Sequence, residues 1–112
     1  FIIGNESKNK NLKQVVQIIS LDNYCQKNKI KKIDLMKIDV EGYEYMALLG
    51  GKKVMKNVKY LIIEIQKNNM YQNYSKEKIE FFLKKQKFKL LKKFNFPLMF
   101  FQDRIYENQN IN

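Results

Sequence analysis

Acidic side chains gather in one short stretch of an otherwise basic chain. Asp34, Asp39, Glu41 and Glu44 fall within 11 residues, and Glu64 lies near the end of the next apolar run. The whole chain of 112 residues holds only 11 acidic residues against 22 basic ones, so this concentration is local. Grouped carboxylates can accept hydrogen bonds from a ligand hydroxyl or amine, bind a hard cation, or serve as a general base.

Asp39 and Glu41 are the strongest candidates for a ligand site. Asp39 lies at the carboxyl end of the apolar stretch 33–40, which predicts a strand, and Gly42 then permits a sharp turn into a helix. If strand geometry continues as far as Glu41, its side chain points to the same side as that of Asp39. A structural role fits the pattern equally well, because Glu41 and Glu44 favour a helix N-terminus and Asp39 can cap it.

Glu64 interrupts the apolar run 61–65, which predicts another strand. A carboxylate inside such a strand is costly to bury unless it is paired or lies at the end of the strand. Glu64 is therefore either a third member of the site or the partner of a neighbouring lysine.

Several classes of site are excluded by composition. The chain has no histidine and one cysteine, Cys25, which excludes a disulfide framework within the chain, zinc ligation by Cys and His, and Ser-His-Asp or Cys-His catalysis. Its apolar runs are too short to cross a bilayer, and no signal peptide is visible. The composition fits a reducing, cytoplasmic setting.

The net charge of +11 comes almost entirely from scattered lysines, with Arg104 as the single arginine. Codon bias toward Lys and Asn explains such a composition, although the charge still predicts salt-sensitive attraction to polyanions. Residues 81–101 interleave lysines with phenylalanines, which is compatible with a basic nucleic-acid-binding α/β module. We favour a pair of strands with an aromatic inner face and a lysine-rich outer face.

The elements that must position the acids follow from periodicity and from helix-capping residues. Helices are predicted from Ser20 to about residue 28, over 43–50, and after Ser75, with Ile79, Phe82 and Leu83 facing inward. Strands are predicted at 15–19, 33–40, 58–65, 88–94 and 98–102, with the last antiparallel to its predecessor. Residues 1–11 and 66–74 are expected to be loops, and 107–112 to be frayed.

This alternation of strands and helices predicts an open α/β sheet. Ligands of such sheets sit beyond the carboxyl ends of the strands. Asp39 and Glu64 both lie at or near such an end, so the predicted topology brings them to one edge of the sheet.

The order and spacing of four short motifs resemble the carboxyl half of FkbM-type methyltransferases. The first is a Leu-Asp pair before a helix, at 21–22. The second is the block Lys-Ile-Asp-Val-Glu-Gly-Tyr-Glu at 37–44, followed by the Leu-Leu-Gly helix end at 48–50. The last is the apolar strand with its glutamate at 61–65. The match covers roughly residues 15–90.

The resemblance implies a Rossmann-like class I methyltransferase fold, of which residues 1–112 form the carboxyl-terminal portion. The predicted strands 33–40, 58–65, 88–94 and 98–102 are then the fourth to the seventh, the last being antiparallel. The glycine-rich turn that binds S-adenosylmethionine in this fold has no counterpart, because the only glycines are at 4, 42, 50 and 51. We therefore expect the cofactor-binding half to lie outside a chain that starts at Phe1, and we assign no cofactor-binding residues.

The resemblance also implies the reaction, which is transfer of a methyl group from S-adenosylmethionine, with oxygen as the expected acceptor atom. Asp39 is the first choice as acceptor-orienting residue or base, with Glu41 and Glu64 next. No metal is expected, and a cation bridging Asp39 and Glu64 is the less favoured alternative. The acceptor can be a small molecule, a sugar or a lipid, and peptides also stay open. A catalytically inactive remnant is the remaining alternative to the nucleic-acid-binding module.

Overall fold

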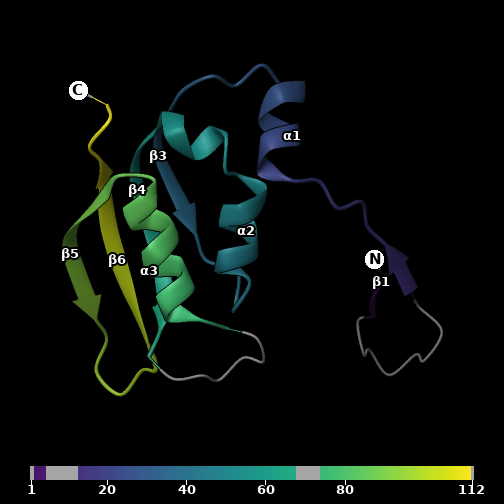
Figure 1. The fold of residues 1–112 in the computed structure, drawn as a ribbon. Helices are drawn as coiled ribbons and strands as arrows, with labels where there is room; N and C mark the ends of the chain where they lie inside the picture. The colour runs from purple at the N-terminus through teal and green to yellow at the C-terminus, as the bar shows by residue number, and fades with distance from the viewer. Residues whose placement is uncertain (1, 5–12, 68–73, 112) are drawn as a thin grey trace.

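A four-stranded mixed sheet forms the centre of the molecule in the computed structural model, which describes residues 2–4, 13–67 and 74–111. The strands are β3 (Ile33–Ile38), β4 (Val58–Gln66), β5 (Phe88–Asn95) and β6 (Phe101–Asn108), in the spatial order β3-β4-β6-β5 (Figure 1). β3 and β4 are parallel, whereas β6 lies between β4 and β5 and is antiparallel to both. The predicted α/β class and the antiparallel last strand are confirmed.

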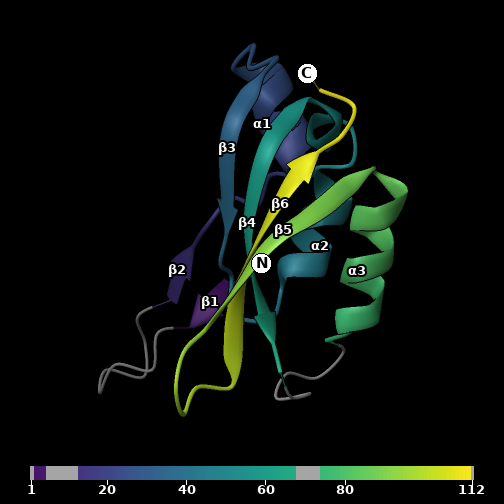
Figure 2. The ribbon, with the colours of Figure 1, turned by 90° about the vertical axis from the view of Figure 1, so that its left-hand side faces the viewer.

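The helices of the described residues cover one face of this sheet. They are α1 (Leu21–Lys27), α2 (Glu44–Gly50), the 3-10 helix η1 (Val54–Asn57) and α3 (Lys76–Lys85). Figures 1 and 2 show α2 and α3 on the same side of the sheet, and α1 packs against α2 and η1 near the β3 edge. No described helix lies on the opposite face, and no helix in the described part of the chain is long and apolar enough to cross a membrane.

The two predicted helix starts are confirmed by their capping hydrogen bonds. The backbone N–H of Asn23 donates to Ser20 Oγ at 3.2 Å, and that of Lys78 donates to Ser75 Oγ at 3.3 Å. These bonds satisfy N–H groups that have no partner within the helix. The predicted inward face of α3 is also confirmed, and it packs into a core built from the following buried residues: Ile38, Leu48, Met55, Val58, Leu61, Ile63, Ile65, Ile79, Phe82, Leu83, Phe88 and Tyr106.

The side chain of the buried Asn108 connects β6 to η1 and the start of β4 by hydrogen bonds. Asn108 is fully buried, and its Nδ2 donates to the carbonyl oxygens of Met55, Lys56 and Val58 at 3.3, 3.2 and 3.0 Å. Its Oδ1 accepts from the backbone N–H of Asn110 at 3.0 Å. β6 therefore extends to Asn108 and does not end at residue 102 as predicted, and the expectation that residues 107 and 108 are frayed is wrong.

The single arginine has an internal role. Arg104 is 2% exposed, its Nε donates to Gln102 Oε1 at 2.6 Å, and its Nη1 lies 3.6 Å from Glu80 Oε2 on α3. It is therefore not available to bind phosphate or a base edge. Phe88, one of the phenylalanines interleaved with lysines, is likewise in the core.

Several boundaries differ from those predicted. The β-branched run 15–19 is not a strand, because β2 (Lys13–Val15) ends at its first residue. Ile18 is 66% exposed, and none of the described strands pairs with residues 16–19. β2 instead pairs with β1 (Ile2–Gly4), so residues 2–4 are not a loop, and residues 5–11 lie outside the described part.

The predicted strand 98–102 begins too early. Leu98 has a φ of 61° and is 99% exposed, so it belongs to the turn that connects β5 to β6. Gln66, expected in a loop, is the last residue of β4, and residues 68–73 of that expected loop lie outside the described residues.

Candidate active site

A tight turn follows β3 and carries two of the acidic residues. The strand ends at Ile38, and the turn places Glu41 at a φ of 50° and Gly42 at a φ of 97°. Both are left-handed conformations, which glycine adopts freely and a glutamate adopts only at a cost of roughly 1 kcal/mol. The predicted strand 33–40 thus ends two residues early, so strand geometry does not reach Glu41, and the turn sets the direction of its side chain instead.

Glu44 holds this turn from inside the fold. The residue is fully buried at the start of α2, and its Oε1 accepts from the backbone N–H groups of Val40 and Gly42 at 3.2 and 3.3 Å. Within the described residues, its Oε2 has no hydrogen-bond partner. The last glutamate of the 37–44 block thus fixes the backbone on both sides of Glu41. Its place in the first turn of α2 agrees with the structural alternative, whereas Asp39 does not cap this helix, because the N-cap is Tyr43 and has no side-chain hydrogen bond.

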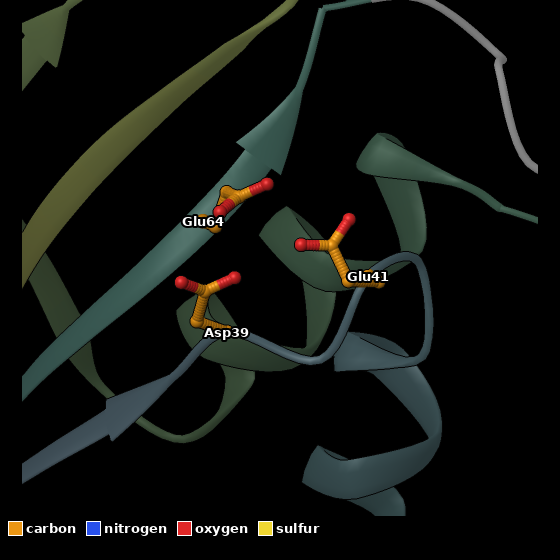
Figure 3. Close-up of side chains that lie close together, drawn as sticks. All are labelled: Asp39, Glu41 and Glu64. Atoms are coloured by element: carbon orange, nitrogen blue, oxygen red, sulfur yellow. The ribbon is translucent and has the colours of Figure 1, made fainter.

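Three of the predicted acids converge at the carboxyl ends of the parallel strands. One carboxylate oxygen from each of Asp39, Glu41 and Glu64 lies within 4.8 Å of the others. Figure 3 shows Glu64 projecting from β4 toward the other two side chains, which come from the segment after β3. Asp39 and Glu41 are exposed, whereas Glu64 is only 7% exposed.

Glu64 has an unusual protonation equilibrium. Burial, followed by the hydrogen bond and the negative charge of Asp39, raises the pKa of Glu64 to about 7, and the charge of Glu41 acts in the same direction. Gln66 opposes this shift by donating from its Nε2 to Glu64 Oε1 at 2.6 Å. No lysine within 4.0 Å pairs with Glu64 among the described residues, whereas Lys37 Nζ lies 4.0 Å from Asp39. Glu64 can therefore gain or lose a proton near neutral pH.

Asp39, Glu41 and Glu64 line a hollow of about 380 Å³, and the other residues of its lining were not predicted from the sequence. Gln66, Asp103 and residues 99–101 complete its lining. Asp103 lies directly opposite Glu64 in the register of β4 and β6. The sequence signal was weak, because Asp103 is an isolated aspartate and residues 99 and 100 were predicted in a strand, whereas they belong to the turn that borders the hollow.

The arrangement supports two kinds of chemistry. A carboxylate whose pKa lies near neutrality, as that of Glu64 does, can take a proton from a ligand hydroxyl. The same oxygens from Asp39, Glu41 and Glu64 are close enough to share one hard cation, which takes several oxygen ligands at about 2.0–2.6 Å. A bound proton in the first case, or a bound cation in the second, reduces the repulsion between the carboxylates.

The described residues do not fit the binding site of S-adenosylmethionine itself. No described strand runs into a glycine-rich turn, and Gly42 belongs to the acidic turn. The glycines that end α2 serve packing, since a Cβ at Gly51 would lie 3.0 Å from Leu21 Cδ1 and one at Gly50 would lie 3.4 Å from Ser20 Cβ. These residues therefore place one short helix against another, and the acidic hollow is the part of the chain that suits a ligand.

Comparison with known proteins gives one match. The family model described as the methyltransferase FkbM domain matches residues 4–90, which include the acidic turn and Glu64. Neither the curated proteins nor the solved structures give a match. The match covers more than half of the chain, and it includes the block 37–44 that forms the acidic turn. The chain therefore belongs to the FkbM methyltransferase family.

Proposed function

We propose that the chain is the carboxyl-terminal portion of an S-adenosylmethionine-dependent methyltransferase that methylates an oxygen atom, and that its acidic hollow binds the methyl acceptor. The observation that carries this proposal is the convergence of Asp39, Glu41 and Glu64 at the carboxyl ends of β3 and β4. That edge of an α/β sheet is where ligands of such folds bind.

The acidic residues fit the requirements of an acceptor site. S-adenosylmethionine, when bound, supplies a methyl group on a sulfonium, and the acceptor hydroxyl must lose its proton as it becomes a methyl ether or ester. Asp39 orients the hydroxyl by accepting its hydrogen bond and takes the proton, and Glu64 shares that proton with Asp39. Glu41, on the facing side, binds a second hydroxyl or an amine of the acceptor. The main contribution of the protein is this positioning.

The sheet also leaves room for a cofactor-binding half of Rossmann-like class I type. β3 pairs with β4 on one side, and its other edge has no partner among the described residues. Leu35 on β3 is 58% exposed, on the sheet face that no described helix covers. A long, unpaired strand edge with an apolar face is a surface that proteins normally cover. We place the missing strands and helices on this edge and face.

The proposal is tested with the protein extended by its upstream reading frame. Methyl transfer from tritiated S-adenosylmethionine is measured with sugar, lipid and small hydroxylated acceptors, each against the same acceptor blocked at its hydroxyl. We expect label to appear in an acid-stable and base-stable methyl ether, or in a base-labile ester where the acceptor is a carboxylate. Two results contradict the proposal: an upstream reading frame that encodes no strand followed by a glycine-rich turn, or an extended protein that transfers no label. Either result leaves the catalytically inactive remnant as the alternative.

A further inference from the structure

A second concave surface lies between α2 and α3, apart from the acidic hollow. It has a volume of about 560 Å³, and it shares no lining residue with the acidic hollow. One wall is formed by α2 and η1 and the other by α3. We call it the α2–α3 groove.

The floor of the groove is apolar and partly open to solvent. Leu49 on α2 is 41% exposed and Phe81 on α3 is 68% exposed, while Phe82, which also lines the groove, is buried in the core. Large apolar side chains exposed together in a hollow are typical of binding surfaces. Nothing in the proposed methyl transfer uses these residues.

Lysines stand on both walls of the groove. Lys52 and Lys56 belong to the α2–η1 wall, and Lys78 and Lys85 belong to α3. Within the described residues none of the four forms an ion pair, since the salt bridges there join other residues. The one acid of the lining, Glu77, accepts a hydrogen bond from Ser75 Oγ at 3.4 Å.

The α3 wall has the spacing of a helix-binding surface. Lys78, Phe81, Phe82 and Lys85 follow one another at the i, i+3, i+4 and i+7 positions of a single helical stripe. The stripe is roughly 10 Å long, at about 1.5 Å per residue, which matches about two turns of a partner helix lying along it.

We propose that the α2–α3 groove binds an acidic amphipathic helix of a partner protein. Apolar side chains of the partner fill the hollow above Leu49 and Phe81, and flanking carboxylates face the lysines on the two walls. This is the helix-in-groove mode of recognition, in which apolar anchors give affinity and the charges at the rim give steering and orientation. A hollow flanked by two rows of like charge favours a narrow amphipathic helix over a flat anionic surface.

The proposal is tested on the 112-residue chain with a synthetic helical peptide of roughly 14 residues. The peptide has Leu or Phe at i, i+3, i+4 and i+7 and Glu beside them, and it carries a fluorophore for anisotropy titration. One control peptide replaces each Glu by Gln, and another has the same composition in scrambled order. Amide NMR shifts of the chain locate the bound peptide.

We expect the acidic peptide to bind with a Kd on the order of 10 μM and to shift amides of α2, η1 and α3. Phe81→Ser and the double variant Lys52→Glu/Lys56→Glu should each weaken binding by about tenfold or more. Lys89→Glu, which changes an exposed lysine on β5 outside the groove, is the matched control and should change binding less than twofold.

Three results overturn the proposal. One is equal binding of the scrambled peptide, and another is an equal loss of affinity in Lys89→Glu, because either shows attraction by net charge alone. The third is binding of vesicles rich in phosphatidylserine or of single-stranded RNA through the groove without binding of the acidic peptide.

Discussion

Asp39, just after β3, and Glu64, on the neighbouring parallel strand β4, bring their carboxylates together at the carboxyl end of the sheet. Their carboxylate oxygens lie within 4.8 Å of each other, and Asp39 is the main charged neighbour that raises the pKa of the buried Glu64 to about 7. Glu64 therefore stays partly protonated at neutral pH, and its deprotonated fraction can accept a proton from a ligand.

The raised pKa of Glu64 makes the stability of the chain depend on pH. In the unfolded chain the carboxyl titrates near 4.5, and in the folded chain it titrates near 7. The stabilising contribution of its bound proton is therefore complete below about pH 4.5 and is lost as the pH rises through about 7. We expect the free energy of unfolding to fall by on the order of 2–3 kcal/mol over this window relative to Glu64→Gln, which cannot titrate. Urea denaturation of both proteins at several pH values measures the difference, and parallel curves would show that Glu64 titrates normally.

Removing the Glu44 carboxylate should loosen the acidic turn. Glu44→Ala leaves the N–H groups of Val40 and Gly42 without their acceptor, which should cost about 1–3 kcal/mol of folding stability. Glu44→Gln keeps an acceptor oxygen and should lose less than half as much. Thermal denaturation gives the stabilities, and amide NMR shifts of residues 39–42 should move in the alanine variant. Equal stability of all three proteins would show that Glu44 does not hold the turn.

Asn108 should be one of the most sensitive polar residues of the fold. Asn108→Ala removes the donor shared by three carbonyl oxygens in a fully buried position, and the expected loss is about 2–4 kcal/mol. The neighbouring exposed residue gives the control, since Gln109→Ala should change stability by less than about 0.5 kcal/mol. Denaturant titration compares the two, and similar small losses would contradict the role assigned to Asn108.

The 112-residue chain alone should not bind S-adenosylmethionine measurably. The described strands provide no glycine-rich turn for the cofactor, and the acidic hollow suits the acceptor instead. Isothermal titration calorimetry of the chain with S-adenosylmethionine should therefore show only heats of dilution. A micromolar dissociation constant would place a cofactor site within these residues and contradict the division between the two halves.

Local sequence signals predicted the elements whose cause is local. Ser20 and Ser75 begin helices because their hydroxyls cap the backbone, and the largely apolar segment 58–65 is predicted as a strand from its β-branched and aromatic residues. The run 15–19 has the same β-branched composition but is exposed, so composition alone misassigned it. The segment 58–65 pairs with neighbouring strands, and the run 15–19 does not pair beyond residue 15 among the described residues. The local sequence pattern carries no information about such pairing.

The residues of the acidic site were predicted from the sequence, but their geometry was not. The motif block pointed to Asp39, Glu41 and Glu64, and the structure brings them together. Their convergence depends on the left-handed φ of Glu41, which is held by Glu44 from a distance of three residues. Asp103 joins the hollow only through the pairing of β6 with β4, a long-range contact without a signal in the sequence.

The proposed role of Asp39, which is to take the proton of the acceptor hydroxyl, is tested by measuring methyl transfer with the extended protein. Initial rates with saturating tritiated S-adenosylmethionine are compared for the unmodified protein and for Asp39→Asn, with thermal denaturation as the check on folding. We predict a loss of turnover on the order of 10²-fold or more with an unchanged fold, because asparagine cannot take the proton. Unchanged turnover in Asp39→Asn would remove Asp39 from the mechanism and contradict the account.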